Sequence, residues 1–396
     1  MSKLTGLPTE SSAKASILLC LLKWPMPKQF DVCIRGGGVV GRTLALLLAR
    51  ERLRVALVVR APAQAGATTD VRAYALNSAS RQLLTSLRAW PEPAFATPVL
   101  DMQVWGDDGA RLDFSARDLS EPALAWIVDV PALEHQLGEA VRYQGQIELV
   151  DEPVKAPLQV VCEGKQSSSR NEFGASWTVR PYPQKAVAAR LLSDKPHLGV
   201  ARQWFHNGEI LALLPASSTN PLDAGNSLAL VWSVSSERAD ALQAMSGDEF
   251  CAALQGSCGE LPGKLQLAGE RASWPLALSN ADRWVGPGWA LAGDAAHTVH
   301  PLAGQGLNLG LGDAAALADV ISKREYWRGL GDEKLLRRYE RARKADVAAM
   351  GAVTDGLHGI FSQSNPGWQA ARGWGMKGFA QSGLLKSWVM RQAAGL

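Results

Sequence analysis

The fold of this chain is constrained most by residues 31–60, DVCIRGGGVVGRTLALLLARERLRVALVVR. An apolar run ends there in a cluster of glycines, and a helical pattern follows with Leu44, Leu47 and Leu48 on one face. A second, nearly all-apolar run covers 54–59, and strands that are apolar on both faces are typical of parallel sheets. The pattern predicts a strand–helix–strand unit with a right-handed crossover, as in nucleotide-binding α/β folds.

The glycine cluster has the spacing GxGxxG, with Gly36, Gly38 and Gly41 as its glycines. The first glycine permits a tight turn, the second lets backbone amides approach a pyrophosphate, and the third lets the helix pack close to the strand. Val40 lies inside the same turn, so these four residues are candidate cofactor contacts. Because the positive end of the helix faces bound phosphates, the turn predicts a dinucleotide site.

The second strand lacks the acidic residue that usually binds a ribose in such units. An Asp or Glu is expected about twenty residues after the turn, but Val59 stands there. Valine accepts no hydrogen bond from a ribose hydroxyl, and losing such a contact costs about 1.5–3 kcal/mol of binding. The neighbouring Arg60 either contacts a phosphate or is simply solvated.

A second glycine-rich motif, GDAAHTVHPLAGQGLN, covers residues 293–308. Asp294 follows a hydrophobic run, so its carboxylate is expected at the carboxyl end of a strand, where α/β folds bind ligands. There it can accept a hydrogen bond from a sugar-alcohol hydroxyl. Gly304, Gln305 and Gly306 open a helix, whose backbone amides can donate to a ring that gains negative charge.

The rest of the chain predicts two kinds of structure. Helical patterns cover 77–90 and 132–145, and strands with hairpin character follow between 175 and 234. We expect an α/β fold of the α+β two-domain kind, with a Rossmann-like FAD-binding domain, an inserted antiparallel β-sheet substrate domain and C-terminal helices. The expected boundaries are 1–27 for a disordered extension or one that precedes the true start, 28–97, 131–174 and 276–330 for the Rossmann-like domain, 98–130 and 175–275 for the β-rich domain, and 331–396 for the helical region.

The two glycine-rich motifs together resemble those of the single-component FAD-dependent aromatic hydroxylases, and most closely those of the ubiquinone-biosynthesis hydroxylase family. Residues 293–317 match the second FAD motif of that family nearly throughout. The other matching segments are DVRAYALN at 70–77, YPQKAVAA at 182–189, QWFHNGEILALLP at 203–215, LVWSV at 230–234 and the helical pattern at 335–361. The resemblance covers residues 28–394.

The resemblance implies that the chain binds FAD. It places the ADP half at the glycine turn and the ribityl chain at Asp294, and a middle motif, DG-x-x-S-x-x-R, begins here with Glu163 in place of Asp. The implied cofactor residues are Gly36, Gly38, Val40, Gly41, Arg72, Glu163, Asp294, Gly304, Gly306, Leu307 and Asn308. The implied catalytic residues, which border the flavin ring and the face where oxygen reacts, are Pro301, Gly304, Gln305 and Gly306.

The resemblance also implies monooxygenase chemistry. NAD(P)H reduces the flavin, which adds oxygen as a hydroperoxide, and water must be excluded until an aromatic ring attacks. Because no second GxGxxG follows an apolar, strand-like run, NAD(P)H is expected as a transient co-substrate. The expected substrate is an aromatic, polyprenylated small molecule. Four residues of the inserted sheet either contact it or pack in the core: Tyr182, Gln184, Trp204 and Phe205.

Composition and spacing argue against several other functions. The net charge of +3 gives no indication of a nucleic-acid partner. The five cysteines are scattered without a CxxC, which argues against zinc and disulfides and favours a cytoplasmic location. Asp294, His297 and His300 have the residue types of a metal site, but their loop context indicates no metal and a hydrogen-bonding His297. No apolar run reaches the length that spans a bilayer.

The C-terminal tail combines tryptophans with basic residues, namely Trp368, Trp374 and Trp388 with Arg372, Lys377, Lys386 and Arg391. The tail either packs on the FAD-binding domain or contacts a biosynthetic complex or the inner membrane face, where a polyprenylated substrate would lie. The sequence leaves open whether the protein forms a homo-oligomer.

The leading hypothesis is an FAD-dependent monooxygenase that hydroxylates a polyprenylated phenol in ubiquinone biosynthesis. Three departures from the family pattern bear on cofactor affinity and reductant use, namely Val59, Glu163 and a short segment between 145 and 163 with room for one or two strands. They motivate one alternative, a non-catalytic member that acts as a partner in a quinone-biosynthesis complex. A second alternative is another FAD oxidoreductase of the same fold.

Overall fold

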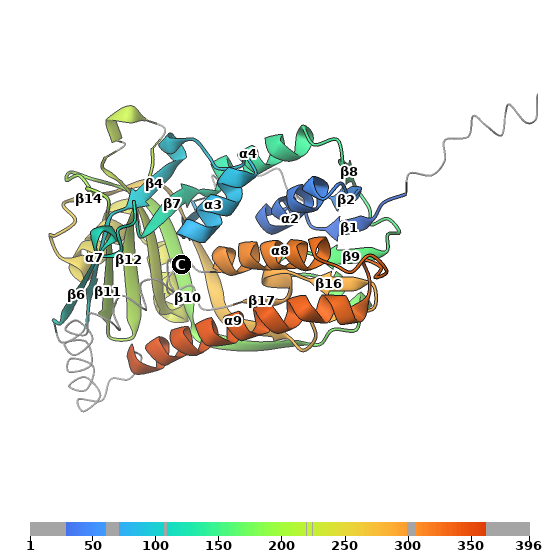
Figure 1. Cartoon of the computed structure of the whole chain (residues 1–396). Helices are drawn as coiled ribbons and strands as arrows, with labels where there is room; N and C mark the ends of the chain where they lie inside the picture. Colours follow the sequence, from blue (N-terminus) through green and yellow to red (C-terminus); the bar gives the residue numbers. More distant parts are fainter. Residues whose placement is uncertain are drawn as a thin grey trace, which may run out of the picture.

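The computed structural model describes residues 29–60, 71–106, 109–218, 220–223, 225–298 and 306–361. Two lobes lie side by side (Figure 1). We call them the Rossmann-like lobe, which contains a six-stranded sheet, and the sheet lobe, which contains an eight-stranded sheet. The expectations for residues 1–27, for Pro301, Gly304 and Gln305, and for the tail beyond 361 lie outside the described residues.

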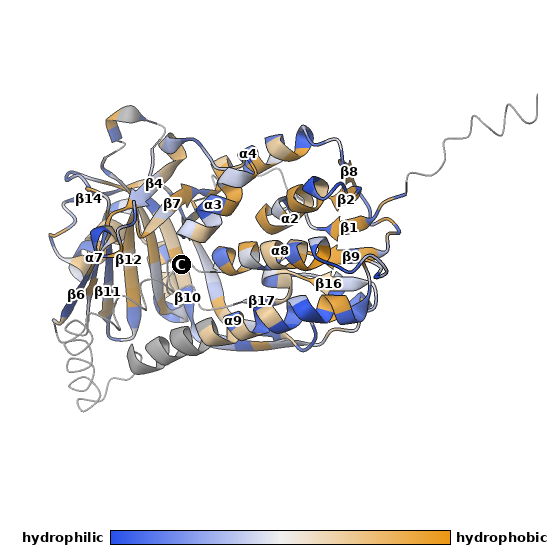
Figure 2. Ribbon diagram, in the orientation of Figure 1, coloured by the Kyte–Doolittle hydropathy of each residue, from blue (hydrophilic) through white to orange (hydrophobic). Residues whose placement is uncertain are grey.

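The six-stranded sheet has the order β15-β16-β9-β1-β2-β8, and its first two strands in the chain flank helix α2. Its strands are β1 (Val32–Arg35), β2 (Val55–Val58), β8 (Ile147–Val150), β9 (Leu158–Val161), β15 (Val285–Gly286) and β16 (Trp289–Leu291). All neighbours run parallel except β15 and β16. Strands β1, β2 and β9 are mostly apolar (Figure 2), as expected for a parallel sheet buried on both faces, with Arg35 and Gln159 as their polar residues.

Helices cover this sheet and connect its segments. They are α2 (Val39–Arg50), α3 (Ser78–Ser86), α4 (Val130–Arg142), α5 (Ser169–Glu172), α8 (Gly306–Ser322) and α9 (Glu333–Phe361). Leu44 and Leu48 of α2 are fully buried in the core of this lobe, on the face that the sequence predicts. The adjacent parallel pair β1 and β2, joined through α2, confirms the predicted strand–helix–strand unit. No helix of the described residues is long and apolar enough to cross a membrane.

The eight-stranded sheet has the order β17-β14-β10-β13-β12-β11-β5-β6. Its strands are β5 (Asp101–Trp105), β6 (Arg111–Ser115), β10 (Trp177–Ser193), β11 (Val200–His206), β12 (Glu209–Pro215), β13 (Ser227–Ser235), β14 (Leu265–Ala281) and β17 (His297–Thr298). It is antiparallel apart from the pair β5 and β11. Helices α6 (Ser236–Ala244) and α7 (Gly247–Cys258) pack their apolar side chains against one face of it.

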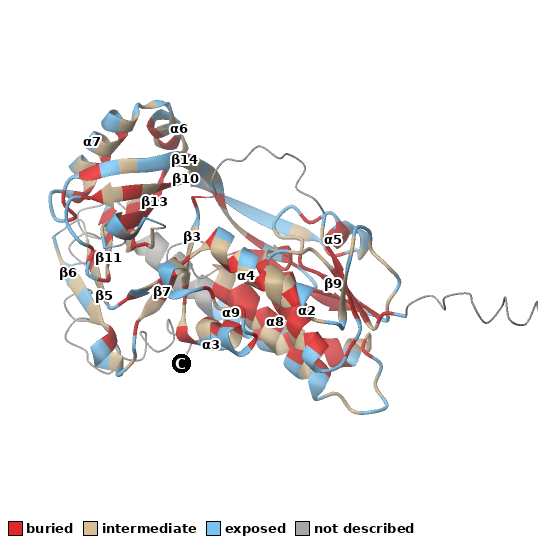
Figure 3. Ribbon diagram, turned by 90° about the horizontal axis from the view of Figure 1, so that it is seen from above, coloured by how far each residue is buried: buried red, intermediate tan, exposed pale blue. Residues whose placement is uncertain are grey.

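Strands β10 and β14 join the two lobes. Each has 17 residues, and they pair from Trp177 with Ala281 to Ser193 with Leu265 (Figure 3). The Trp177–Ala281 end lies at the Rossmann-like lobe, since Ala281 belongs to its core, whereas Leu265 belongs to the core of the sheet lobe. A continuous two-stranded ribbon therefore fixes the position of one lobe relative to the other.

A third sheet, which the sequence did not predict, lies between the lobes. It is formed by β3 (Ala73–Leu76), β4 (Ala96–Val99) and β7 (Ala125–Asp129), with β7 in the centre and both pairs antiparallel. Strand β3 comes from the segment expected in the Rossmann-like domain, β4 crosses the expected boundary between 97 and 98, and β7 comes from the segment expected in the β-rich domain. The remaining elements are short 3₁₀ helices, namely η1 (Pro93–Phe95), η2 (Ala116–Leu119), η3 (Pro221–Asp223) and η4 (Gly293–Ala295).

Candidate active site

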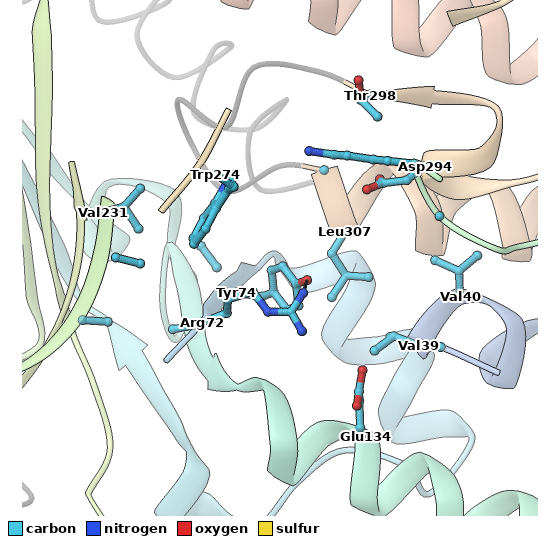
Figure 4. A pocket seen from close by; sticks show the side chains of 18 of the residues that line it. Val39, Val40, Arg72, Tyr74, Glu134, Val231, Trp274, Asp294, Thr298 and Leu307 are labelled. Carbon is cyan, nitrogen blue, oxygen red and sulfur yellow. Dashed lines mark hydrogen bonds between the residues drawn. The ribbon is translucent and has the colours of Figure 1, made fainter. Parts of the chain in front are cut away.

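One cavity of about 1460 Å³ lies between the lobes. On one side it is lined by the glycine turn after β1, by the loop after β9 and by the start of α8. On the other side it is lined by strands of the eight-stranded sheet (Figure 4). Because open α/β sheets bind ligands at the carboxyl ends of their strands, this cavity is the candidate active site.

The glycine turn is shaped by close backbone contacts. A Cβ on Gly36, whose φ is +114°, would lie 2.5 Å from the carbonyl oxygen of Cys162, and a Cβ on Gly41 would lie 1.9 Å from the carbonyl oxygen of Gly36. A Cβ on Gly38 would meet no atom within 4 Å, because this residue faces the cavity. Gly38 also precedes α2 without a side-chain cap, so the first amides of α2 are free to donate to a ligand.

Val59 lies against the same turn. Its γ-methyl groups occupy the space beside Gly37, where a Cβ would approach them to 2.6 Å. Val59 lines the cavity and offers a ligand only apolar contact, so the missing ribose acid is not replaced at this position. Arg60 also lines the cavity and is exposed, which is compatible with both alternatives for its role.

Asp294 lies in η4, just beyond the end of β16, and its carboxylate points into the cavity (Figure 4). Burial raises the pKa of this carboxyl above its ordinary value, although the charges of Lys165 and His297 act in the opposite direction. No described residue donates a hydrogen bond to its side chain. A hydroxyl group on a ligand would therefore find an acceptor without a competing partner.

The loop that carries Asp294 is held by a buried ionic network. Asp313 of α8, which has no exposed surface, accepts from the backbone amide of Gly293 at 2.9 Å and contacts Nε2 of His297 at 2.7 Å. Its other oxygen accepts from Nε of Arg343 on α9 at 2.8 Å. The indole of Trp284 stacks on His297 at 4.7 Å between ring centres. The expected hydrogen-bonding role of His297 is thus confirmed, whereas Asp313 and Arg343 were missed.

The middle motif folds around its own acidic residue. Glu163 accepts from the hydroxyls of Ser167 and Ser169 at 2.8 Å each and from the amide of Ser169 at 3.3 Å. Burial raises the pKa of Glu163, but these hydrogen bonds and the charge of Arg60 outweigh it, and the net effect is a lowered pKa. The Glu163 side chain therefore shapes the loop 163–169, which lines the cavity.

Arg170 ends the motif and connects it to the Asp294 loop. Its guanidinium donates to the carbonyl of Ala295 at 3.2 Å and to that of Lys165 at 2.6 Å, and it lies 3.7 Å from the ring centre of Trp177. Burial lowers the pKa of Arg170, and the nearby charge of Glu163 opposes this effect. Two segments more than a hundred residues apart in the sequence are thus held at one end of the cavity.

Comparisons with known proteins identify the family. The family model described as an FAD binding domain matches residues 126–354. The 3-demethoxyubiquinol 3-hydroxylase of Escherichia coli (strain K12) is 30% identical, over 92% of this chain and 98% of that protein. The chain belongs to the ubiquinone-biosynthesis FAD hydroxylase family. Ubiquinone hydroxylase UbiL of Rhodospirillum rubrum is also 30% identical, over 93% of this chain and 90% of that protein.

The fold of this hydroxylase agrees with solved structures. P. aeruginosa PqsL, solved in complex with 2-aminobenzoylacetate, matches with a TM-score of 0.72 over 85% of this chain and 97% of that chain, at 22% identity. The protein is an FAD-dependent monooxygenase, with FAD as its cofactor and NAD(P)H as its co-substrate. The free space at Gly38, the carboxylate of Asp294, to which no described residue donates, and the start of α8 at the cavity wall are features that fit FAD.

The structure brings most of the predicted cofactor residues of the hydroxylase to one cavity. The described ones that line it are Gly36, Gly38, Val40, Arg72, Glu163, Asp294, Gly306 and Leu307. Gly41 lies behind the turn, where it allows α2 to pack closely. Within the described residues, no group of three or more His, Cys, Asp or Glu side chains is placed to hold a metal ion.

The side chain of Asn308, another expected cofactor residue, makes its contacts within the protein. Its side chain is buried and does not line the cavity. Its oxygen accepts from the amide of Asn77 at 3.0 Å and from the hydroxyl of Ser80 at 2.7 Å, and its amide donates to the carbonyl of Ala75 at 2.8 Å. Asn308 therefore joins α8 to the β3–α3 segment, a contact between positions more than 200 residues apart that no local pattern reveals.

The four substrate candidates also lie away from the cavity lining. Gln184 donates to the carbonyl of Gly208 at 2.8 Å, and Trp204 stacks on Trp105 at 4.9 Å between ring centres. Phe205 is buried with neighbouring strands, and Tyr182 is half-buried at a bulge of β10. Because side chains alternate along a strand, Ala201 and Gln203 of β11 face the cavity and Trp204 faces away from it.

The cavity wall on the sheet side was missed by sequence reasoning. It includes Trp274 of β14, whose indole projects into the cavity (Figure 4). It also includes the polar residues Gln203 and Ser233. Strand alternation predicts which residues share a face, but the hydrophobic pattern does not distinguish the face covered by α6 and α7 from the face that borders the cavity. Only the arrangement of the helices decides between them.

Proposed function

We propose that this hydroxylase inserts an oxygen atom into the ring of a polyprenylated phenol in ubiquinone biosynthesis. The observation that carries the proposal is the division of one cavity into a polar half and an apolar half. The lining residues between 99 and 127 and between 188 and 277 include no charged side chain, and most are aliphatic or aromatic. A wall of this kind suits an aromatic ring with an apolar tail and leaves no partner for a charged substrate.

The size of the cavity supports two ligands at once. Pockets for one small molecule usually have volumes of about 300–1,000 Å³. The cavity here has about 1460 Å³ and extends from the glycine turn to the sheet. A dinucleotide along the polar half therefore leaves room for a substrate against the apolar half, which brings the ring next to the flavin end.

Each part of the polar half has a proposed role in holding FAD. Gly36 and Gly38 would admit the pyrophosphate, Asp294 would accept from the ribityl chain, and the amides at Gly306 and Leu307 would face the ring. The roles of Pro301, Gly304 and Gln305 rest on the family motif alone. When bound, FAD supplies electron transfer from NAD(P)H and the activation of oxygen. The apolar wall excludes water from the place where the ring reacts.

The reaction can be tested with the purified protein, FAD, NAD(P)H and a phenol that carries a short prenyl chain, under ¹⁸O₂. One oxygen atom should enter a ring C–H bond to give a hydroxyl group, while the other leaves as water with two electrons from NAD(P)H and a proton from solvent. A product that contains one labelled atom supports the proposal. A product without label indicates another FAD oxidoreductase, and no phenol-stimulated NAD(P)H oxidation indicates a non-catalytic partner.

The C-terminal tail is proposed to contact the membrane surface that holds such a substrate. Residues 362–396 carry four basic side chains and no acidic one, together with three tryptophans. Basic residues are attracted to anionic lipid surfaces, and tryptophan favours the interface between headgroups and acyl chains. A protein that takes a polyprenylated ring from a bilayer would gain from this proximity.

A further inference from the structure

Two polar side chains lie in the apolar half of the cavity. Gln203 of β11 and Ser233 of β13 line the cavity and are only 6% and 4% exposed. Neither side chain has a hydrogen-bond partner within the described part of the chain. Their polar atoms are reached from the cavity, and a ligand that displaces water from them without offering a polar atom would leave them unpaired, which is unfavourable. Both groups therefore point to polar atoms of a ligand.

The surroundings of these two residues make the feature specific. Ala212, which pairs with Gln203 on the neighbouring strand, and Val231, which pairs with Ala212, are apolar and line the same wall. Ser233 lies opposite Ile210, another apolar lining residue. Gln203 and Ser233 are thus two isolated polar points in an apolar wall, which is how a pocket fixes the orientation of its ligand.

The strand register sets the separation of the two points. Gln203 is level with Val231 across β12, and Ser233 is two residues further along β13. With neighbouring strands about 4.8 Å apart and about 3.3 Å per residue, the two backbone positions are about 12 Å apart. After the side chains extend into the cavity, this distance leaves room for one substituted ring between them, and it is too long for both groups to bind the same oxygen.

We propose that Gln203 and Ser233 are the specificity-determining residues of the substrate site and bind two different oxygen substituents of the ring. The inference rests on the proposed function, since it names how that substrate is held. Both groups are neutral and can donate or accept, so they suit hydroxyl or ether oxygens. A site built to bind such oxygens discriminates against a ring that lacks them, because its own buried groups then remain unpaired.

The experiment uses the FAD-loaded protein with the variants Gln203→Met and Ser233→Ala. Gln266→Met and Ser227→Ala are matched controls, because they make the same changes at residues of the same sheet that do not line the cavity. The ligands are 3-geranylcatechol, 2-geranylphenol and geranylbenzene, which differ only in the number of ring oxygens. Quenching of flavin fluorescence reports the dissociation constant, and the yield of product per NAD(P)H consumed reports how well the ring is oriented.

Each test variant should weaken binding of 3-geranylcatechol roughly tenfold, which corresponds to the loss of one hydrogen bond. Binding of geranylbenzene should be unchanged, the control variants should resemble wild type, and product per NAD(P)H should fall in the test variants only. An equal loss for all three ligands would mean that the residues act through packing, and no loss would mean that they do not bind the ring. If wild type hydroxylates 2-geranylphenol, either of these two contrary outcomes overturns the roles of Gln203 and Ser233 and leaves the proposed function intact. If wild type neither binds nor hydroxylates any of the phenols, the proposed function falls with it.

Discussion

At the scale of single residues, the negative charge of Asp294 lowers the stability of the free protein but favours FAD binding. Burial is the main reason that its pKa is raised, so the folded protein without ligand binds a proton more tightly than the unfolded chain. The free energy of unfolding contributed by this group therefore falls as the pH rises through that pKa. A hydroxyl of FAD that donates to the carboxylate would stabilise the charged form, lower the pKa and release a proton.

Because FAD binding would release the proton of Asp294, we predict that FAD binds more tightly as the pH rises from the acid range toward neutrality. Asp294→Asn keeps an acceptor oxygen but removes the charge, so it should weaken FAD binding about tenfold at neutral pH and abolish this pH dependence. The same variant without FAD should unfold at a higher urea concentration than wild type. Fluorescence titration of FAD at several pH values is the measurement, with the exposed Asp319→Asn on α8 as control. Parallel pH curves for wild type and Asp294→Asn would contradict the prediction.

At the scale of secondary-structure elements, the Asp313 network decides how α8, α9 and the Asp294 loop are held together. A buried charge that loses its partner is costly, whereas removal of both charges of a pair is often tolerated. Asp313 has two charged or polar side-chain neighbours, His297 and Arg343, and also binds the amide of Gly293. The network therefore connects the stability of the helices to the geometry of the cofactor loop.

We predict that Asp313→Asn lowers the free energy of unfolding by about 3 kcal/mol and weakens FAD binding, because the amide nitrogen can replace only part of these contacts. The double variant Asp313→Asn with Arg343→Met should recover part of the stability. Urea unfolding followed by fluorescence measures both. Arg337→Met, which removes a pair with Glu333 on the surface of α9, should change the free energy of unfolding far less, because solvent screens this pair. If the buried and surface variants lose the same stability, the network does not have this role.

At the scale of the whole molecule, the tail should make membrane binding depend on charge. Each basic residue near an anionic surface contributes about 1 kcal/mol, so replacement of Arg372, Lys377, Lys386 and Arg391 by Gln should weaken binding to vesicles with anionic lipid by at least a hundredfold. Binding to vesicles of neutral lipid should change little. Vesicle flotation at two salt concentrations measures this effect, which salt should screen.

The control for this prediction replaces four basic residues that are exposed on the described surface, namely Arg88, Arg117, Arg142 and Lys323. It removes the same net charge from the protein as a whole. If both sets of substitutions reduce vesicle binding equally, the effect comes from the overall charge, and the tail has no special role.

Much of the polar half of the site could be predicted from the sequence, because its chemistry is local. A short motif specifies each of these features, because each depends on a few neighbouring residues. They are the conformation of Gly36, the free space at Gly38 and the position of Asp294 after a strand. The parallel sheet could be predicted for the same reason, since strands such as β1 and β2 are buried on both faces.

The sequence by itself determined the parallel sheet, the glycine turn, the cofactor class and the family, since each depends on residue types at short spacings. Only the tertiary structure decided which side chains form the apolar wall of the cavity, that the side chain of Asn308 joins α8 to the β3–α3 segment, and that Asp313 and Arg343 hold the Asp294 loop. These properties depend on contacts between positions far apart in the chain and on which sheet face the helices cover. A local pattern predicts that side chains alternate between the two faces of a strand, but the packing of the whole molecule determines which face borders the cavity.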